Sequence, residues 1–141
     1  MRIALLGASG RAGRHVLSAA AQRGHEVSVL VRDPARLPAD VPPEPRVVVG
    51  DSISPTALTE LVKDADVVLS TPGPTAKDRH LHESTAHALL SVMRERGPRR
   101  FVGVSGAGVD VPGDEKATRD RLISGLIMRL CGEAVKDKPA E

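Results

Sequence analysis

The chain has 141 residues, enough for one folded domain with a buried core. Its 20 lysines and arginines nearly balance its 18 aspartates and glutamates, and Phe101 is its only Phe, Trp or Tyr, so nothing indicates nucleic-acid binding. The single cysteine, Cys131, excludes an intrachain disulfide, and no apolar stretch approaches the length of a membrane span, so we expect a cytoplasmic protein.

The first elements along the chain are a strand, a glycine-rich turn and a helix. Residues 2–6 form a short apolar run that predicts a buried strand. Residues 14–23 carry apolar side chains at the spacing of one helix face. A strand that turns directly into a helix leaves backbone N–H groups and the positive end of the helix dipole facing one point. That point attracts phosphate.

The turn has the spacing G-x-x-G-x-x-G rather than the more familiar G-x-G-x-x-G. Gly7 permits the tight turn, Gly10 lets a pyrophosphate approach the backbone, and Gly13 lets the helix lie close against the strand. Ser9 adds a hydroxyl at the turn, and Arg11 adds a cation beside the phosphates. Three glycines at this spacing are also compatible with a tight turn that holds no ligand.

A second strand is predicted at residues 26–31, and Arg32 follows it. In a dinucleotide-binding βαβ unit this strand end faces the adenosine ribose. An acidic residue there accepts the ribose hydroxyls of NAD, whereas an arginine suits a 2′-phosphate. Because a guanidinium binds phosphate through two parallel hydrogen bonds, Arg32 favours NADP(H) over NAD(H), with Arg36 nearby on the next turn. The alternative is that Arg32 is a solvated surface cation.

The rest of the chain continues the alternation of strands and helices. Asp33 and Pro34 predict a capped single turn, and the proline-rich residues 38–45 predict a surface connector. We expect further strands at 46–49, 66–70 and 99–104, and further helices at 55–62, 80–96 and 115–130.

Five short apolar strands alternating with helices predict an α/β fold, a doubly wound parallel sheet covered on both faces. Right-handed crossovers give the Rossmann strand order 3-2-1-4-5. Ligands bind such sheets outside the carboxyl ends of the strands, where the strand order reverses. Glycine-rich or polar segments follow all five predicted strands at this edge: 7–13, 32, 50–51, 71–74 and 105–108.

With these segments in place, the sequence resembles the atypical short-chain dehydrogenase/reductases, the NAD(P)H-binding, NmrA-like and flavin/biliverdin-reductase-like group. The matching segments follow in order along nearly the whole chain: 7–13, 31–37, 49–51, 64–68 and 104–108. The resemblance implies that Gly10, Arg11 and Ala12 meet a pyrophosphate and that Arg32 meets the 2′-phosphate of NADP(H).

The resemblance also assigns the other parts of a dinucleotide. It implies that Asp51 and Ser52 lie beside the adenine. It implies that Thr71, Pro72 and Gly73 line the ribose on the nicotinamide side.

For the reacting end of the cofactor, the resemblance offers Ser105, which lies where the family places a hydroxyl near the nicotinamide and the substrate. Better-known short-chain dehydrogenases use a Tyr-x-x-x-Lys pair, in which the lysine lowers the tyrosine pKa. The sequence contains no tyrosine, so that pair cannot operate here. Family members commonly continue into a sixth strand and a smaller substrate-binding lobe. We therefore expect residues 1–141 to be one NAD(P)-binding domain without most of that lobe, and residues 132–141 to be a loose or truncated end.

Three functions remain open from the sequence. The first is an NADPH-dependent reductase of a small flavin- or quinone-like acceptor, which needs little proton donation from the enzyme. The second is a non-catalytic NADP(H)-binding regulator that senses redox state. The third is a truncated inactive copy, in which a homodimer would cover the edge left at the fifth strand.

Two other classes of site are disfavoured. His80, His82 and His87 do not have the spacing to share one metal ion without further ligands, so we expect no metal site. Ser105 meets only half of the hydrolase pattern G-x-S-x-G, because Gly103 stands two residues before it but Ala107 stands two residues after it, so a hydrolase is not expected.

Overall fold

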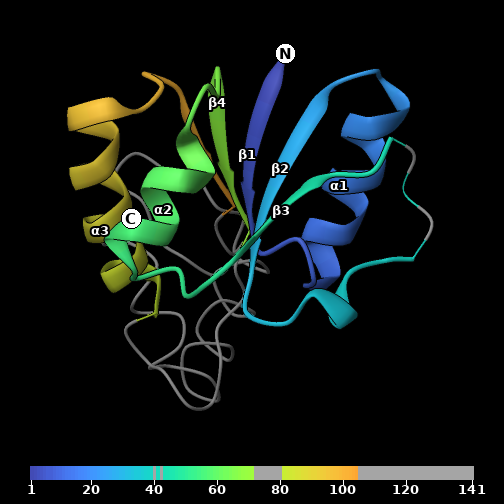
Figure 1. The fold of residues 1–141 in the computed structure, drawn as a ribbon, viewed down its shortest axis with the longest axis horizontal. Helices are drawn as coiled ribbons and strands as arrows, with labels where there is room; N and C mark the ends of the chain where they lie inside the picture. The colour runs from blue at the N-terminus through green and yellow to red at the C-terminus, as the bar shows by residue number, and fades with distance from the viewer. Residues whose placement is uncertain (40, 42, 72–80, 105–141) are drawn as a thin grey trace, which may run out of the picture. The chain divides into compact units, whose positions relative to one another are not determined.

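The computed structural model describes residues 1–39, 41, 43–71 and 81–104, and these residues contain five strands and three α-helices. The strands are β1 (Arg2–Leu6), β2 (Glu26–Val31), β3 (Arg46–Val49), β4 (Val67–Ser70) and β5 (Phe101–Gly103). They form one parallel sheet in the order β3-β2-β1-β4-β5, as predicted from the sequence (Figure 1).

The central strand β1 sets the level at which its neighbours end. Leu6, its last residue, pairs with Leu30 of β2 on one side and with Ser70 of β4 on the other. The next strand outward is aligned in the same way, since Val31 of β2 pairs with Val49 of β3. The carboxyl ends of these four strands therefore lie at one edge of the sheet, where a doubly wound fold binds its ligands.

The described helices lie on both faces of the sheet. Helix α1 (Arg11–Gln22) lies on one face, and α2 (Pro55–Val62) lies on the other together with residues 87–96 of α3 (Leu81–Arg96) (Figure 1). Successive residues of β1 point to opposite faces, so Leu5 packs in the core under α1 and Leu6 in the core under α2 and α3. The prediction of a doubly wound α/β fold is confirmed.

Local signals in the sequence account for two of the helical starts. The Asp33 carboxylate caps the 3₁₀ turn η1 (Pro34–Arg36), and the Ser54 hydroxyl caps α2 by accepting a hydrogen bond from the Ala57 N–H. In both cases a proline occupies the first position of the element, where its missing N–H costs nothing.

The observed boundaries differ from the predicted ones by a few residues. Helix α1 begins at Arg11 rather than at residue 14, because Gly10 already occupies the cap position directly after the turn. Strand β5 is shorter than predicted, since it begins at Phe101 and ends at Gly103 rather than spanning 99–104. The predicted helix at 115–130 and Cys131 lie outside the described residues.

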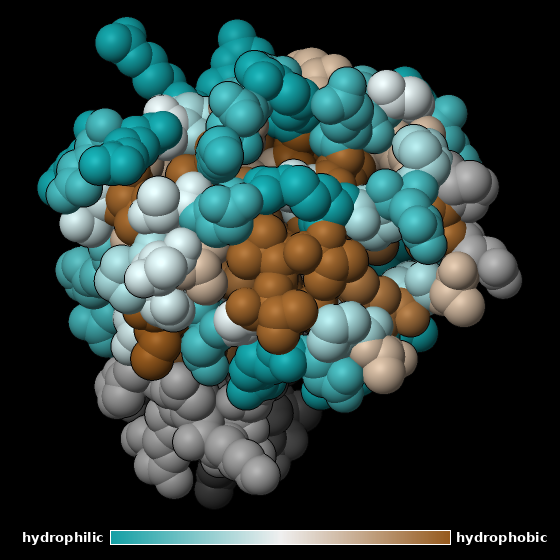
Figure 2. Space-filling view, in the orientation of Figure 1, coloured by the Kyte–Doolittle hydropathy of each residue, from teal (hydrophilic) through white to brown (hydrophobic). Residues whose placement is uncertain are grey.

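The outer strand β3 is exposed on the face that carries α1. Val47 is 40% and Val49 is 62% exposed, because only the short turn η1 and a connector join β2 to β3 there. The space-filling view shows apolar side chains gathered on the side of the molecule where β3 runs (Figure 2). Among the described residues, no helix combines the length and the apolar character that crossing a membrane requires.

Candidate functional site

The glycine turn joins β1 to α1 with very little space to spare. Gly7 has a φ of 81°, which a glycine adopts without strain, and its carbonyl accepts a hydrogen bond from the Gly10 N–H at 2.9 Å. At Gly13, a Cβ atom would lie 2.0 Å from the Gly7 carbonyl oxygen, so a side chain cannot fit there. The first turn of α1 therefore contacts the backbone that leaves β1, with no side chain between them.

The N-terminus of α1 is left open. Within the described part of the chain, the N–H groups of Arg11, Ala12 and Gly13 have no hydrogen-bond acceptor, and the first backbone bond of the helix runs from Arg14 to Gly10 at 3.2 Å. Gly10 offers no side-chain cap, and the first turn contains no acidic residue. Unpaired N–H groups and the helix dipole together attract an anion to this point.

Arg14 is a residue that the sequence analysis did not single out. Its Nε donates to the Gly10 carbonyl at 3.3 Å, so this exposed guanidinium is held over the first turn of α1. The signal in the sequence is the four-residue spacing from Gly10, which brings the two onto the same side of a helix. Together with Arg11, it makes this helix start strongly positive.

Thr71 follows β4 and lies beside the glycine turn. Its buried hydroxyl donates to the Leu6 carbonyl at 2.8 Å, and its backbone N–H donates to the same oxygen at 3.0 Å. A Cβ at Gly13 would lie 2.7 Å from the Thr71 hydroxyl oxygen. The structure thus gives Thr71 a contact with the turn, whereas its expected place at a ribose remains a prediction.

Two arginines are exposed just beyond β2. Arg32 follows the last residue of the strand and Arg36 ends the turn η1, and neither guanidinium bonds to another described residue. Arg46 of β3 is different, because its guanidinium donates to the Ser28 hydroxyl at 3.0 Å and to the Glu60 carboxylate at 2.6 Å. Arg32 and Arg36 therefore remain available to an anion, whereas Arg46 is held by the protein.

The segment after β3 turns tightly into α2. The Gly50 N–H donates to the Val31 carbonyl at 3.0 Å, which continues the pairing between β2 and β3. The Asp51 carboxylate accepts from the Ile53 N–H at 3.2 Å, and Ser52 is partly buried. Asp51 is exposed at the same sheet edge as Arg32. Asp51 and Ser52, the residues expected beside the adenine, thus both lie on this turn.

The structure brings most of the predicted site residues to the carboxyl edge of the sheet. The residues placed there belong to the turns after β1, β2, β3 and β4: Gly7, Ser9, Gly10, Arg11, Ala12, Gly13, Arg32, Arg36, Asp51, Ser52 and Thr71. Pro72, Gly73, His80 and Ser105 lie outside the described residues.

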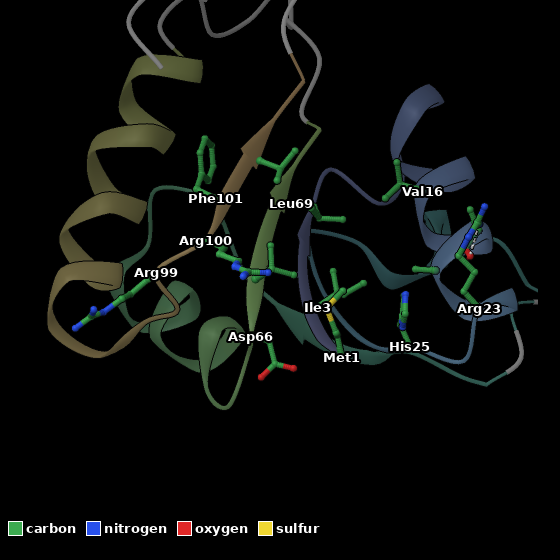
Figure 3. Close-up of a pocket in the computed structure, with 14 residues that line it drawn as sticks. Met1, Ile3, Val16, Arg23, His25, Asp66, Leu69, Arg99, Arg100 and Phe101 are labelled. Carbon is green, nitrogen blue, oxygen red and sulfur yellow. Dashed lines mark hydrogen bonds between the residues drawn. The ribbon is translucent and has the colours of Figure 1, made fainter.

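A hollow of about 850 Å³ opens elsewhere, beside α1 and over the starts of β1, β4 and β5, and it extends to Leu69 of β4 (Figure 3). Its apolar floor includes Val67, Leu69 and Val102, and Arg23 of α1 lies at its edge. None of the residues of the glycine turn lines this hollow, so we do not assign the dinucleotide to it. The sequence signal for it is the alternation of residues in β4 and β5, which places Val67, Leu69 and Val102 on the face that carries α1.

Arg2 and Asp66 close this far edge of the sheet. The Arg2 N–H donates to the Asp66 carboxylate at 2.8 Å, and the Arg2 guanidinium approaches the same carboxylate at 3.3 Å. The backbone hydrogen bond from Arg2, with the nearby guanidinium, lowers the pKa of Asp66 below its usual value. These contacts tie the start of β1 to the start of β4 and serve the fold rather than a site.

Comparison with known proteins agrees with this geometry. A family model described as NAD(P)H-binding matches residues 7–134. The protein YwnB of Bacillus subtilis (strain 168) is 33% identical over 119 residues, which cover 84% of this chain and 54% of YwnB. A 3-diazoavenalumate denitrifying reductase of Streptomyces sp is 36% identical over 127 residues, which cover 79% of this chain and 40% of that enzyme.

A solved structure shows the same fold. A short-chain dehydrogenase/reductase from Veillonella parvula DSM 2008 superposes with a TM-score of 0.77 at 20% identity, over 99% of this chain and 60% of that one. The chain spans about half the length of the curated relatives that it matches. The glycine turn, the strand order and the match over residues 7–134 lead to one conclusion. The chain belongs to the NAD(P)H-binding family and has the Rossmann fold.

Proposed function

We propose that the chain binds NADP(H) at the carboxyl edge of its sheet and uses it to reduce a small acceptor. The observation that carries this proposal is the open first turn of α1, whose Arg11, Ala12 and Gly13 N–H groups have no acceptor in the described part of the chain. A pyrophosphate is the group that these N–H groups and the helix dipole fit, because it supplies several anionic oxygens at one point.

The proposed cofactor extends in both directions from this turn. Toward β2 and β3, Arg32 and Arg36 bind the 2′-phosphate, and Asp51 and Ser52 lie beside the adenine. The support for this direction is that both guanidinium groups are exposed and unpaired among described residues, at the end of the strand that faces the adenosine in this fold. Preference for NADP(H) over NAD(H) follows from those two cations.

Toward β4, the proposed contacts to the nicotinamide side come from Thr71, Pro72 and Gly73, with Ser105 near the reacting atoms. NADPH supplies a hydride when it is bound, and the protein's part is to orient it and exclude water. Since the sequence has no tyrosine, the usual tyrosine–lysine proton donor is missing. A flavin- or quinone-like acceptor suits this site because it needs little proton donation, and the name of the Streptomyces relative also describes a reductase.

Calorimetric titration of NADPH and NADH tests the binding proposal. We expect the wild-type chain to prefer NADPH. Arg32→Ala should lose about 1–3 kcal/mol of affinity for NADPH and little for NADH, because only NADPH carries the phosphate that Arg32 binds. Arg23→Ala is the matched control: Arg23 is also exposed, but it follows the last turn of α1, where it donates to the Ala19 carbonyl.

The control variant should bind both nucleotides as the wild type does. Equal loss of NADPH affinity in Arg23→Ala and Arg32→Ala would show a diffuse charge effect and contradict the assignment of Arg32. A wild-type chain that binds neither nucleotide contradicts the whole proposal.

A non-catalytic, redox-sensing NADP(H)-binding protein is the second candidate, and the absence of tyrosine from the sequence favours it. The two candidates differ in turnover. A reductase oxidises NADPH when flavins or quinones are supplied. A sensor binds the nucleotide tightly and reduces none of these acceptors. Its affinity for a partner differs between the NADPH-bound and the NADP⁺-bound protein.

A further inference from the structure

We infer that Thr71 is a positioning residue for the cofactor, and that its hydroxyl fixes the height of the first turn of α1 above the sheet. This inference rests on the proposed binding of a pyrophosphate at that turn. It assigns to the hydroxyl of Thr71 a role through the protein backbone, and it leaves to the rest of Thr71, with Pro72 and Gly73, the proposed contacts on the nicotinamide side.

The first support is that a single carbonyl accepts two hydrogen bonds from Thr71. The Leu6 carbonyl oxygen ends β1 and accepts both the Thr71 N–H, at 3.0 Å, and the Thr71 hydroxyl, at 2.8 Å. The backbone bond alone continues the pairing of β1 with β4 by one residue. The hydroxyl bond adds nothing to the ladder, but it fixes the direction of the Thr71 side chain toward the turn.

The second support is what the fixed side chain contacts. A Cβ atom at Gly13 would meet the Gly7 carbonyl oxygen at 2.0 Å and the Thr71 hydroxyl oxygen at 2.7 Å. Gly13 is therefore held between the turn that leaves β1 and the hydroxyl that follows β4. Because Thr71 is only 6% exposed, water does not compete for this hydroxyl as it would at the surface.

These two contacts set the position of the open N–H groups. Gly13 supplies one of them, and Arg11 and Ala12 supply the others from the same helical turn. A hydroxyl that determines how closely Gly13 approaches the sheet thus determines where all three groups point. Small displacements matter here, because hydrogen bonds to an anion weaken steeply as their angle and length change.

The test is titration of NADPH and NADH against Thr71→Val and Thr71→Ser. Valine keeps the shape of the side chain but places a methyl group where the hydroxyl donates, whereas serine keeps the hydroxyl. We expect Thr71→Val to weaken both nucleotides by about tenfold, the effect of one neutral hydrogen bond, and Thr71→Ser to restore most of the affinity. The ratio of the two affinities should stay at its wild-type value, because both nucleotides carry the pyrophosphate.

A control variant that is destabilised away from the turn shows whether a loss of stability alone weakens nucleotide binding. Val62→Ala removes buried methyl groups at the end of α2, away from the turn, and should lower the melting temperature without changing either affinity. If Thr71→Val does not fold, the pair Thr71→Ser and Thr71→Ala takes its place, since these two side chains differ by the hydroxyl oxygen.

The outcomes distinguish this inference from the proposed function. Wild-type affinity in Thr71→Val, or equal affinity in Thr71→Ser and Thr71→Ala, overturns the inference and leaves the cofactor proposal standing. A change in the NADPH-to-NADH ratio also overturns it, because it would place Thr71 in the recognition of the adenosine phosphate. A wild-type chain that binds neither nucleotide removes the proposed function itself.

Discussion

Two glycines of the described chain show how different the demands on the same residue type can be. Gly13 has no room for a side chain, since a Cβ there would overlap the Gly7 carbonyl oxygen at 2.0 Å. Gly24, in the turn after α1, has a φ of +70° but no atom within 4 Å of an added Cβ. Packing therefore requires glycine at the first position, and backbone conformation favours it at the second.

We predict that Gly13→Ala and Gly24→Ala have different effects on cofactor binding. Gly24→Ala should cost about 1 kcal/mol of folding stability through backbone strain and leave the affinity for NADPH unchanged. Gly13→Ala must push α1 away from β1, so it should destabilise by about 1–3 kcal/mol and also weaken NADPH at least tenfold. Urea unfolding and calorimetry measure the two quantities. Equal NADPH affinities in Gly13→Ala and Gly24→Ala would contradict the proposed pyrophosphate site at the first turn of α1.

At this scale the sequence predicted glycine positions better than side-chain directions. Gly7, Gly10 and Gly13 were identified from their spacing, because only a few backbone paths connect a strand to a helix so tightly. The direction of the Thr71 hydroxyl was not predictable. It depends on the alignment of β4 with β1, which is a long-range contact that no local pattern encodes.

Helix α2 begins with a side-chain cap, whereas helix α1 begins without one. Helix α2 is closed by the Ser54 hydroxyl, which accepts from the Ala57 N–H at 3.4 Å. Helix α1 follows Gly10, with no side-chain cap and no acidic residue in its first turn. A glycine at the cap position costs only about a few tenths of a kcal/mol relative to a capping side chain, and it leaves the N–H groups of the first turn open to an anionic ligand.

We predict that Ala12→Glu separates stability from binding. Ala12 is exposed in the first turn of α1, so a glutamate there should stabilise the ligand-free chain by about 0.3–1 kcal/mol through the helix dipole. The same carboxylate should repel a pyrophosphate and strongly weaken NADPH. Thermal unfolding and titration with NADPH measure these opposite effects.

Ala12→Gln is the control, because it has a similar size and no charge. It should leave stability near that of the wild type and weaken NADPH less than Ala12→Glu does. The prediction is wrong if the glutamate variant binds NADPH as well as the glutamine variant.

Element boundaries were predictable wherever a cap or a proline marks them. Ser54 and Pro55 gave the start of α2 correctly, and Asp33 with Pro34 gave the turn η1. The start of α1 was placed three residues late, because a glycine cap carries no side-chain signal. The bounds of β5 were predicted less accurately, because the length of this strand depends on its pairing with β4.

On the scale of the whole molecule, the two faces of the sheet are buried to different extents among the described residues. Val68 of β4 is fully buried beneath α2 and α3, whereas Val102 of β5 is 53% exposed and lines the hollow beside α1. The sequence predicted a sheet covered on both faces, from the apolar strands. It could not show how far α1 reaches, because that depends on the helix position rather than on any strand.

We predict that replacement of valine by threonine, which keeps the shape and adds a hydroxyl, distinguishes the two faces. Val68→Thr should lower the free energy of unfolding by about 1–3 kcal/mol, since the hydroxyl loses water without a partner. Val102→Thr should change it by less than about 0.5 kcal/mol, as at most exposed sites. Urea denaturation provides the comparison. A large loss in Val102→Thr would mean that this position is covered in the folded protein.

The direct contact between Gly13 and the Gly7 carbonyl has a consequence for how a ligand is received. Because backbone packs directly on backbone there, we expect the helix start to hold its position before any nucleotide arrives. The entropic cost of association then falls on the flexible dinucleotide and not on the polypeptide. We therefore expect nucleotide binding to cause little rearrangement of the protein. The association rate should be set by diffusion and by the surrounding arginines.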